Sequence, residues 1–142
     1  MAVKLTPYLV MNGNASEAIA FYERALDAKV LFKQTFGELP ENAGLSFPAE
    51  TKDRILHASI QIGESTLMLS DTSPDQSVQP GNQMAICLST HDKEQSQRFF
   101  EALQQDGTVR MPLQETFFSP AYGILTDKFG ITWQIHTEGQ HK

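Results

Sequence analysis

The feature that most constrains this chain is an internal repeat. Two stretches keep the same residue types at one constant spacing, in the pairs Asn14/Asp92, Glu17/Gln95, Phe21/Phe99, Tyr22/Phe100 and Glu23/Glu101. Each copy reads as a strand, a capped helix and then three strands. A repeated unit constrains the whole fold, because neither copy can bury both faces of its strands alone. The sequence therefore predicts an α+β fold of two βαβββ modules.

The first half predicts strands at residues 5–11, 29–36, 54–62 and 66–70. Asn14, with Glu17 three residues later, predicts a capping box at the start of a helix that ends near Asp27. In the third strand, alternation places Leu56, Ala58, Ile60 and Ile62 on one face, and His57, Ser59 and Gln61 on the other. One face of this strand is therefore expected to be core and the other polar.

The second half predicts strands at residues 84–90, 108–113, about 117–126 and 131–137. Asp92 is the expected N-cap of a helix that ends at Asp106–Gly107. A turn at residues 127–130 precedes the last strand, with Gly130 supplying a positive φ and Asp127 capping the turn. After the turn, Ile131, Trp133 and Ile135 fall on the core side, and Thr132, Gln134 and His136 fall on the other.

The repeat also sets the expected domain organisation. Residues 1–142 are predicted to form a single domain, with module 1 at about 1–71, a polar connector at 72–82 and module 2 at about 83–142. Pairing the two four-stranded sheets would give a curved, barrel-like surface with helices outside and a concave ligand site inside. The irregular segment 37–53 is either a lid or a surface excursion.

Composition excludes several functions and favours one compartment. The formal net charge of −6 argues against a nucleic-acid surface. The apolar runs are too short to span a bilayer, and no signal-peptide pattern follows Met1. A single cysteine, Cys87, cannot form an intramolecular disulfide. These features predict a cytoplasmic protein without nucleic-acid or membrane partners.

Several short motifs support a family resemblance over nearly the whole chain. They are Pro7-Tyr8-Leu9, Asn12-Gly13-Asn14, Glu17-Ala18, Phe21-Tyr22, His57-Ala58, Met68-Leu69-Ser70-Asp71, Gln114-Glu115-Thr116-Phe117, and Thr126-Asp127-Lys128-Phe129-Gly130 with Trp133. With the paired modules, they resemble the PhnB-like branch of the vicinal oxygen chelate superfamily, the glyoxalase/bleomycin-resistance/dioxygenase fold. The resemblance implies a homodimer and a small-molecule ligand.

The resemblance also implies where a metal would bind, and the residues there are unsuitable. Metal-using members hold one divalent ion with four side chains, and the matching positions here are Thr6, Met68, Ala85 and Gln134. Gln83 is the one neighbour with a usable oxygen. Because Thr, Met and Ala are poor ligands for such an ion, we expect no tight metal site and no cofactor.

The predicted ligand site uses polar and aromatic side chains on the concave face. The candidates are Tyr8, His57, Gln61, Met68, Gln83, Cys87 and Gln134 on this face, and Phe118 and Tyr122 at its mouth; Thr6, Ser59, Ser70, Ala85 and His136 share the concave face. His57 is either a hydrogen-bonded wall residue or a pocket donor or base. Cys87 is interpreted as a small buried filler, and His91, His136 and His141 as exposed.

No pattern in the sequence identifies catalytic residues. Three functions remain: a binding protein that holds a small organic ligand, an enzyme acting on such a molecule without a tight metal, and a non-catalytic structural or regulatory homodimer. A nucleotide-binding glycine-rich strand–helix unit is lacking in the sequence, which disfavours methyl transfer.

Overall fold

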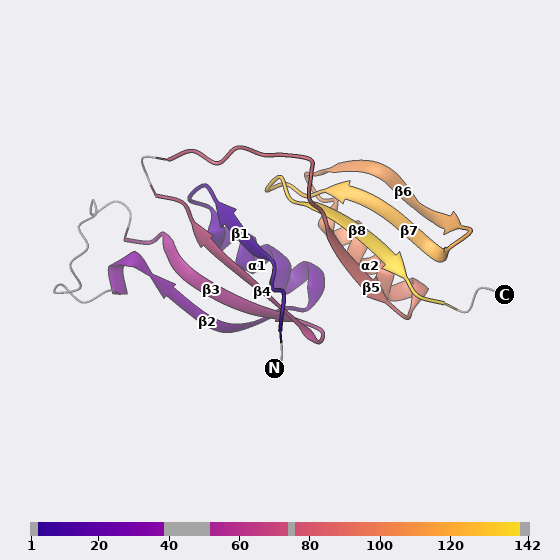
Figure 1. Ribbon diagram of the computed structural model, residues 1–142, viewed down its shortest axis with the longest axis horizontal. Helices are drawn as coiled ribbons and strands as arrows, with labels where there is room; N and C mark the ends of the chain where they lie inside the picture. Colours follow the sequence, from indigo (N-terminus) through magenta and orange to yellow (C-terminus); the bar gives the residue numbers. More distant parts are fainter. Residues whose placement is uncertain (1–2, 39–51, 74–75, 140–142) are drawn as a thin grey trace. The chain divides into compact units, whose positions relative to one another are not determined.

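The computed structural model describes residues 3–38, 52–73 and 76–139 and divides the chain into two compact units, Met1–Gln79 and Pro80–Lys142 (Figure 1). The first contains β1 (Tyr8–Met11), α1 (Ala15–Leu26), β2 (Lys29–Thr35), a short 3-10 helix η1 (Phe36–Glu38), β3 (Ile55–Ile62) and β4 (Ser65–Asp71). The second contains β5 (Ile86–Thr90), α2 (Lys93–Leu103), β6 (Thr108–Thr116), β7 (Ser119–Thr126) and β8 (Thr132–Thr137). The predicted α+β fold of two βαβββ modules is confirmed.

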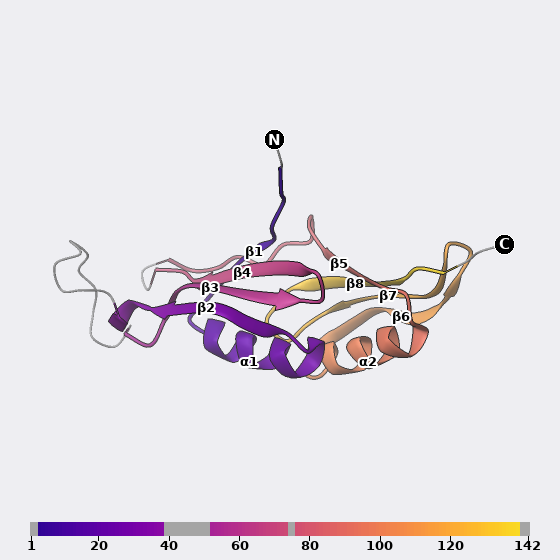
Figure 2. The same cartoon turned by 90° about the horizontal axis from the view of Figure 1, so that it is seen from below.

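Each module has one mixed four-stranded sheet covered on one face by its own helix. The strand orders are β1-β4-β3-β2 and β5-β8-β7-β6, so the first strand of each module pairs in parallel with its last strand. Figure 2 shows α1 along one face of the first sheet and α2 along one face of the second. Both sheets are curved but not closed, and their strand order leaves β1, β2, β5 and β6 at the edges. Within the described residues, the opposite face of each sheet carries no helix of its own module.

The core of each module lies between helix and sheet, as the apolar patterns predict. Ile19 and Tyr22 of α1 are buried with Ile60 and Leu69 of the first sheet. Burying side chains of this size contributes about 1.5–3 kcal/mol each. In the second module the core contains Phe99, Phe100, Leu103, Leu125, Trp133 and Ile135. The described helices are too short or too polar to cross a membrane.

The start of α1 differs from the prediction. Asn14 occupies the N-cap position, but its side chain makes no capping bond, so the predicted capping box with Glu17 is wrong. Instead, the carboxylate of Asp71, at the end of β4, accepts from the backbone N–H of Ala15 at 2.9 Å and of Ile55 at 2.8 Å. One buried carboxylate therefore connects the start of the helix to the start of β3.

In the second module, hydroxyl groups connect the three corresponding elements, α2, β7 and β8. Thr137, at the end of β8, donates to the carbonyl of Ala121 at 2.8 Å, and its Oγ1 lies 2.7 Å from Oγ of Ser96 on α2. The Ser119 hydroxyl at the start of β7 donates to the carbonyl of Thr137 at 2.8 Å. Asp92 caps α2 as predicted, accepting from the Glu94 N–H at 3.0 Å.

Several predicted boundaries and faces shift. The alternation in β3 is interrupted by one extra residue, because Thr35 pairs with Ile55 whereas Gln34 pairs with His57. Ile55 is therefore buried and Leu56 is only partly buried, contrary to the prediction. Helix α2 ends at Leu103, before the predicted Asp106–Gly107 stop.

Other expectations concern segments outside the helices and strands. The irregular segment 37–53 falls mostly on residues 39–51, outside the described residues, as does His141. The assignment of residues 1–142 to a single domain stays a prediction.

The edge strand β2 is unusually exposed. Val30, Leu31 and Phe32 all retain more than a third of their surface, and they lie between the exposed Lys29 and Lys33. An edge strand has one row of backbone N–H and C=O groups without a partner in its own sheet. This apolar segment is therefore bounded by positive charge at both ends.

Candidate functional site

The candidate site is the pair of open faces, defined here as the face of each sheet opposite its own helix. Strand register assigns residues to these faces without ambiguity, because neighbours across a ladder point the same way. On the first open face, Tyr8 pairs with Met68 and Met68 pairs with Ser59. On the second, Cys87 pairs with Gln134 and Ser89 pairs with His136. For these paired residues, the faces predicted within each module agree with the observed register.

Three rings gather on the first open face. The Tyr8 hydroxyl lies 3.3 Å from Nδ1 of His57, and the two rings stack with centroids 5.7 Å apart. Phe32 of β2 packs against His57 with its centroid 5.9 Å away. The imidazole is therefore positioned by a hydrogen bond and by ring contacts from two other strands. This is the arrangement expected of a hydrogen-bonded wall residue, and it leaves Tyr8 and Phe32 each 48% exposed.

The remaining predicted residues of module 1 differ in how directly they contribute to this face. Met68 and Ser70 are partly buried on β4, between β1 and β3. The Gln61 side-chain amide donates to the carbonyl of Gly63 at 3.1 Å, which uses one of its donors in the β3–β4 turn. Thr6 precedes β1 and is partly buried. Tyr8, His57 and Met68 are therefore the central candidates of the first open face.

Three rings also gather on the second open face. Tyr122 packs edge-on to Phe118 at 4.9 Å and to His136 at 6.3 Å. Phe118 and His136 are nearly parallel, with 12° between their planes and 6.3 Å between their centroids. His136 is thus partly buried among aromatic side chains, and its expected exposure is wrong. Gln134 lies on the same face, one alternation before His136.

Cys87 and Gln83 do not occupy the environments expected of them. Cys87 is exposed, so its interpretation as a buried filler is wrong. Its strand β5 is at the sheet edge, and its Sγ is 3.9 Å from Oγ of Ser89. Gln83 and Ala85 precede β5, which begins at Ile86 rather than at residue 84, and both are exposed.

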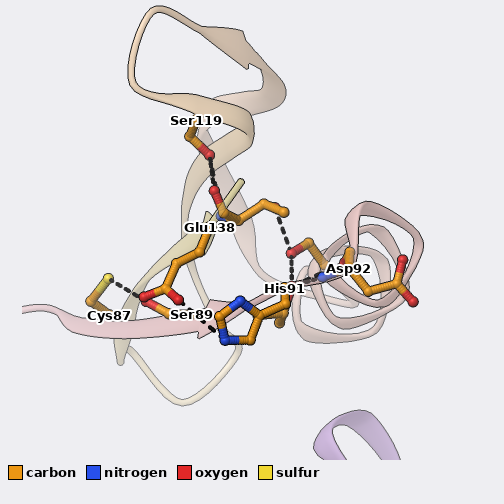
Figure 3. Close-up of polar contacts among 9 residues, drawn as sticks. Cys87, Ser89, His91, Asp92, Ser119 and Glu138 are labelled. Atoms are coloured by element: carbon orange, nitrogen blue, oxygen red, sulfur yellow. Dashed lines mark hydrogen bonds and ion pairs between the residues drawn. The ribbon is translucent and has the colours of Figure 1, made fainter. Parts of the chain in front are cut away.

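Polar side chains at the end of β5 belong to the surface rather than to the open face. Figure 3 shows His91 turned toward the carboxylate of Glu138, with Nε2 and Oε2 3.3 Å apart. Both side chains are more than half exposed, so this pair adds little to stability. The expected exposure of His91 is confirmed.

Sequence reasoning missed Phe32 as a candidate, because a break in strand regularity changes its direction. The pairing of β2 with β3 is irregular between Val30 and Phe32, and this brings Phe32 opposite Ser59 on the open face. Simple alternation in a single strand cannot reveal such an irregularity. The sequence does give one signal: Val30, Leu31 and Phe32 are all apolar, so alternation alone does not show which of them lies on which face of the sheet.

The described residues offer little to a metal ion. Across 3–38, 52–73 and 76–139, no three His, Cys, Asp or Glu side chains gather closely enough to hold one. Met68 and Gln134 lie on open faces, at two of the metal-ligand positions that the family resemblance implies. A thioether and one amide oxygen are a poor ligand set for a hard or borderline divalent ion.

The fold agrees with what comparison with known proteins finds. The sequence model of a family described as 3-demethylubiquinone-9 3-methyltransferase matches residues 3–136. The chain belongs to this PhnB-like family. A relative, protein YjdN of Escherichia coli, is 37% identical over 145 residues, covering 96% of each chain.

Solved structures of similar proteins extend this result. The Pseudomonas aeruginosa protein PA1353 is 34% identical with a TM-score of 0.86, over 98% of this chain and all of the other. A Bacillus cereus PhnB protein, described as a putative 3-demethylubiquinone-9 3-methyltransferase, is 26% identical with a TM-score of 0.76, over 95% and 99%. The fosfomycin resistance protein FosX of Listeria monocytogenes shares the fold at 10% identity and a TM-score of 0.64, over 98% and 96%. The likeness to FosX shows a shared fold.

Proposed function

We propose that this PhnB-like protein binds a small organic molecule on the open faces of its sheets, without a tightly bound metal. The observation that carries the proposal is the clustering of rings and hydrogen-bonding groups on the sheet faces opposite the helices, at strand positions and in the β6–β7 turn. Tyr8 and Phe32 on one face, and Phe118 on the other, keep between 42% and 48% of their surface exposed. Ligand sites commonly combine apolar and aromatic walls with a few polar groups of this kind.

The polar groups on these faces would orient the ligand. His57 and Tyr8 offer one hydrogen-bonding pair, and Gln134 offers an amide that both donates and accepts. Because these groups lie in strands, their backbone is held by the sheet ladders rather than by loops. The binding of both modules to one ligand in a shared concavity stays a prediction.

The decisive experiment is a screen of small organic compounds by thermal shift, followed by titration of the hits. Wild-type protein is compared with His57→Ala and Gln134→Ala, and with Gln97→Ala on the exposed side of α2 as a matched control. A ligand that binds only the folded state raises the melting temperature. The proposal expects hits that weaken in at least one open-face variant and persist in the control. Hits that survive every open-face variant would reject the proposed location.

Catalysis is a separate proposal within the same site. Incubating each hit with protein and following its mass distinguishes turnover from simple binding. Because the matched family is described by a methyl transfer, S-adenosylmethionine belongs in the same titration. A rise in melting temperature with this compound, and its consumption in the presence of a hit, would favour the methyltransferase over the binding protein.

The third candidate is a structural or regulatory homodimer with no ligand. The family resemblance supports a homodimer, which sedimentation at micromolar concentration tests directly. A protein that is dimeric but gives no hit in the screen would favour this function. A monomer would reject the dimer without affecting the proposed ligand site.

A further inference from the structure

Both open faces carry the same three types of ring. The first ring cluster contains Phe32, Tyr8 and His57; the second contains Phe118, Tyr122 and His136. Each cluster draws its rings from separate strands or from the turn beside them. Each includes a phenylalanine that is 42–48% exposed.

The same ring types do not occur at equivalent positions of the repeat in the two clusters. Leu69 pairs with Leu9 and Ala58, and Ile135 pairs with Leu88 and Gly123. Matching these two ladders makes Cys87 the counterpart of Tyr8, Tyr122 the counterpart of His57, and His136 the counterpart of Ser70. The same set of rings thus arises from different positions in the two modules. Duplication of one ancestral module does not by itself account for this agreement.

The second ring cluster has the geometry of a stacking platform. All three of its ring pairs are in contact, whereas the first cluster has contacts through His57 to Tyr8 and to Phe32. Phe118 and His136 lie within 12° of parallel, and Tyr122 stands at 71° and 74° to them. The centroids of Phe118 and His136 are 6.3 Å apart, which leaves no room for a ligand ring between them. A ligand would therefore stack on the exposed side of Phe118.

We propose that the ligand of the second open face is a flat aromatic or heteroaromatic molecule that stacks on Phe118, beside Tyr122 and His136. The inference rests on the proposed function, and it specifies the chemical class of the ligand. Flat rings stack well on aromatic side chains, whereas saturated rings of similar size gain only apolar contact. Gln134, on the same face, would pair with a polar substituent of the ring.

The test uses two probes that differ in flatness and share a charged group. They are 2-naphthoate and its saturated counterpart decahydronaphthalene-2-carboxylate, each titrated by calorimetry. We expect 2-naphthoate to bind at least about ten-fold more tightly than the saturated probe. Phe118→Leu and Tyr122→Leu should each remove most of that preference, because leucine keeps apolar area and loses the ring. Met84→Leu, at an exposed position before β5, is the control.

The outcomes distinguish failure of the proposed ligand class from failure of the proposed binding site. Equal affinities for the two probes would overturn the inference, as would absence of 2-naphthoate binding at millimolar concentration. Non-aromatic hits from the screen that still depend on His57 or Gln134 would then leave the proposed function intact. A preference for 2-naphthoate that persists in both leucine variants would also overturn it, provided that circular dichroism shows both variants folded.

Discussion

Trp133 donates its indole N–H to Oδ2 of Asp127 at 2.9 Å, in a part of module 2 where both side chains are buried. Oδ1 of the same carboxylate accepts from the backbone N–H groups of Phe129 at 2.9 Å and Ile131 at 3.1 Å. Gly130, at φ +88°, completes the turn. The turn before β8 and the core beneath it are therefore built around one carboxylate.

Replacing Asp127 with alanine should destabilise the protein by about 3 kcal/mol, because three N–H donors lose a charged acceptor in a buried setting. Urea unfolding followed by circular dichroism measures the loss. Glu64→Ala, at the exposed β3–β4 turn, is the matched control and should change stability by less than about 0.5 kcal/mol. An Asp127→Ala variant as stable as the control would show that the carboxylate is dispensable.

Asp71→Ala should weaken module 1 by about 2 kcal/mol, since the N–H groups of Ala15 and Ile55 lose their acceptor. Hydrogen exchange followed by NMR gives a residue-specific reading, with faster exchange at these two amides. Thr137→Val removes the hydroxyl that contacts the Ala121 carbonyl and the Ser96 hydroxyl in module 2, and it should leave exchange at the Ala15 and Ile55 amides unchanged. Uniform loss of protection across both modules in Asp71→Ala would contradict a local role.

Gly123→Ala should destabilise module 2 by about 1–3 kcal/mol through overpacking. A Cβ at this position would lie 2.7 Å from Cε2 of Phe100 and 3.0 Å from Cα of Leu113. Gly81→Ala is the control, because a Cβ there meets no atom within 4 Å. Thermal unfolding of both variants checks the prediction, and equal melting temperatures would refute it.

Cys87 should react with a thiol reagent in the native protein at a rate near that of a free thiol, because its side chain is exposed. A ligand on the second open face should slow the labelling, since Cys87 pairs with Gln134 on that face. Mass spectrometry after timed labelling measures both rates. Labelling only after denaturation would show that Cys87 is covered in solution.

Protein prepared without chelator should contain no stoichiometric Zn, Ni, Fe or Mn, and these ions should not raise its melting temperature. The reason is that Met68 and Gln134 cannot replace the water shell of a divalent ion. Elemental analysis makes the measurement. About one metal per chain, lost in Gln134→Ala, would reveal a site that uses other residues.

The sequence predicts features that depend on neighbours along the chain. The two modules, the Asp127 turn and the core position of Trp133 all follow from local periodicity and turn chemistry. The capping of α1 does not, because its acceptor is Asp71, which lies 56 residues from Ala15 in the sequence. A local motif at Asn14 pointed to the wrong partner.

For the candidate site, the sequence predicts on which face of the sheet a strand residue lies, but not how exposed that residue is. Alternation assigns Cys87 and Gln134 to one face correctly, yet the exposure of Cys87 depends on the position of β5 at the sheet edge. Likewise, Phe32 reaches the open face only through an irregularity in strand pairing. Strand order and pairing are tertiary properties, and they decide which predicted residues meet.

The exposed apolar run of β2 has a consequence for handling the protein. Two copies that paired in register through parallel β2 edges would place Lys29 beside Lys29 and Lys33 beside Lys33. This repulsion acts as a gatekeeper against fibrous aggregation, because like charges oppose edge-to-edge growth. Salt shortens its range to about 3 Å at 1 M ionic strength, against about 10 Å at 0.1 M. Storage of concentrated protein in a buffer of high ionic strength would therefore screen the lysine repulsion between β2 edges and promote precipitation.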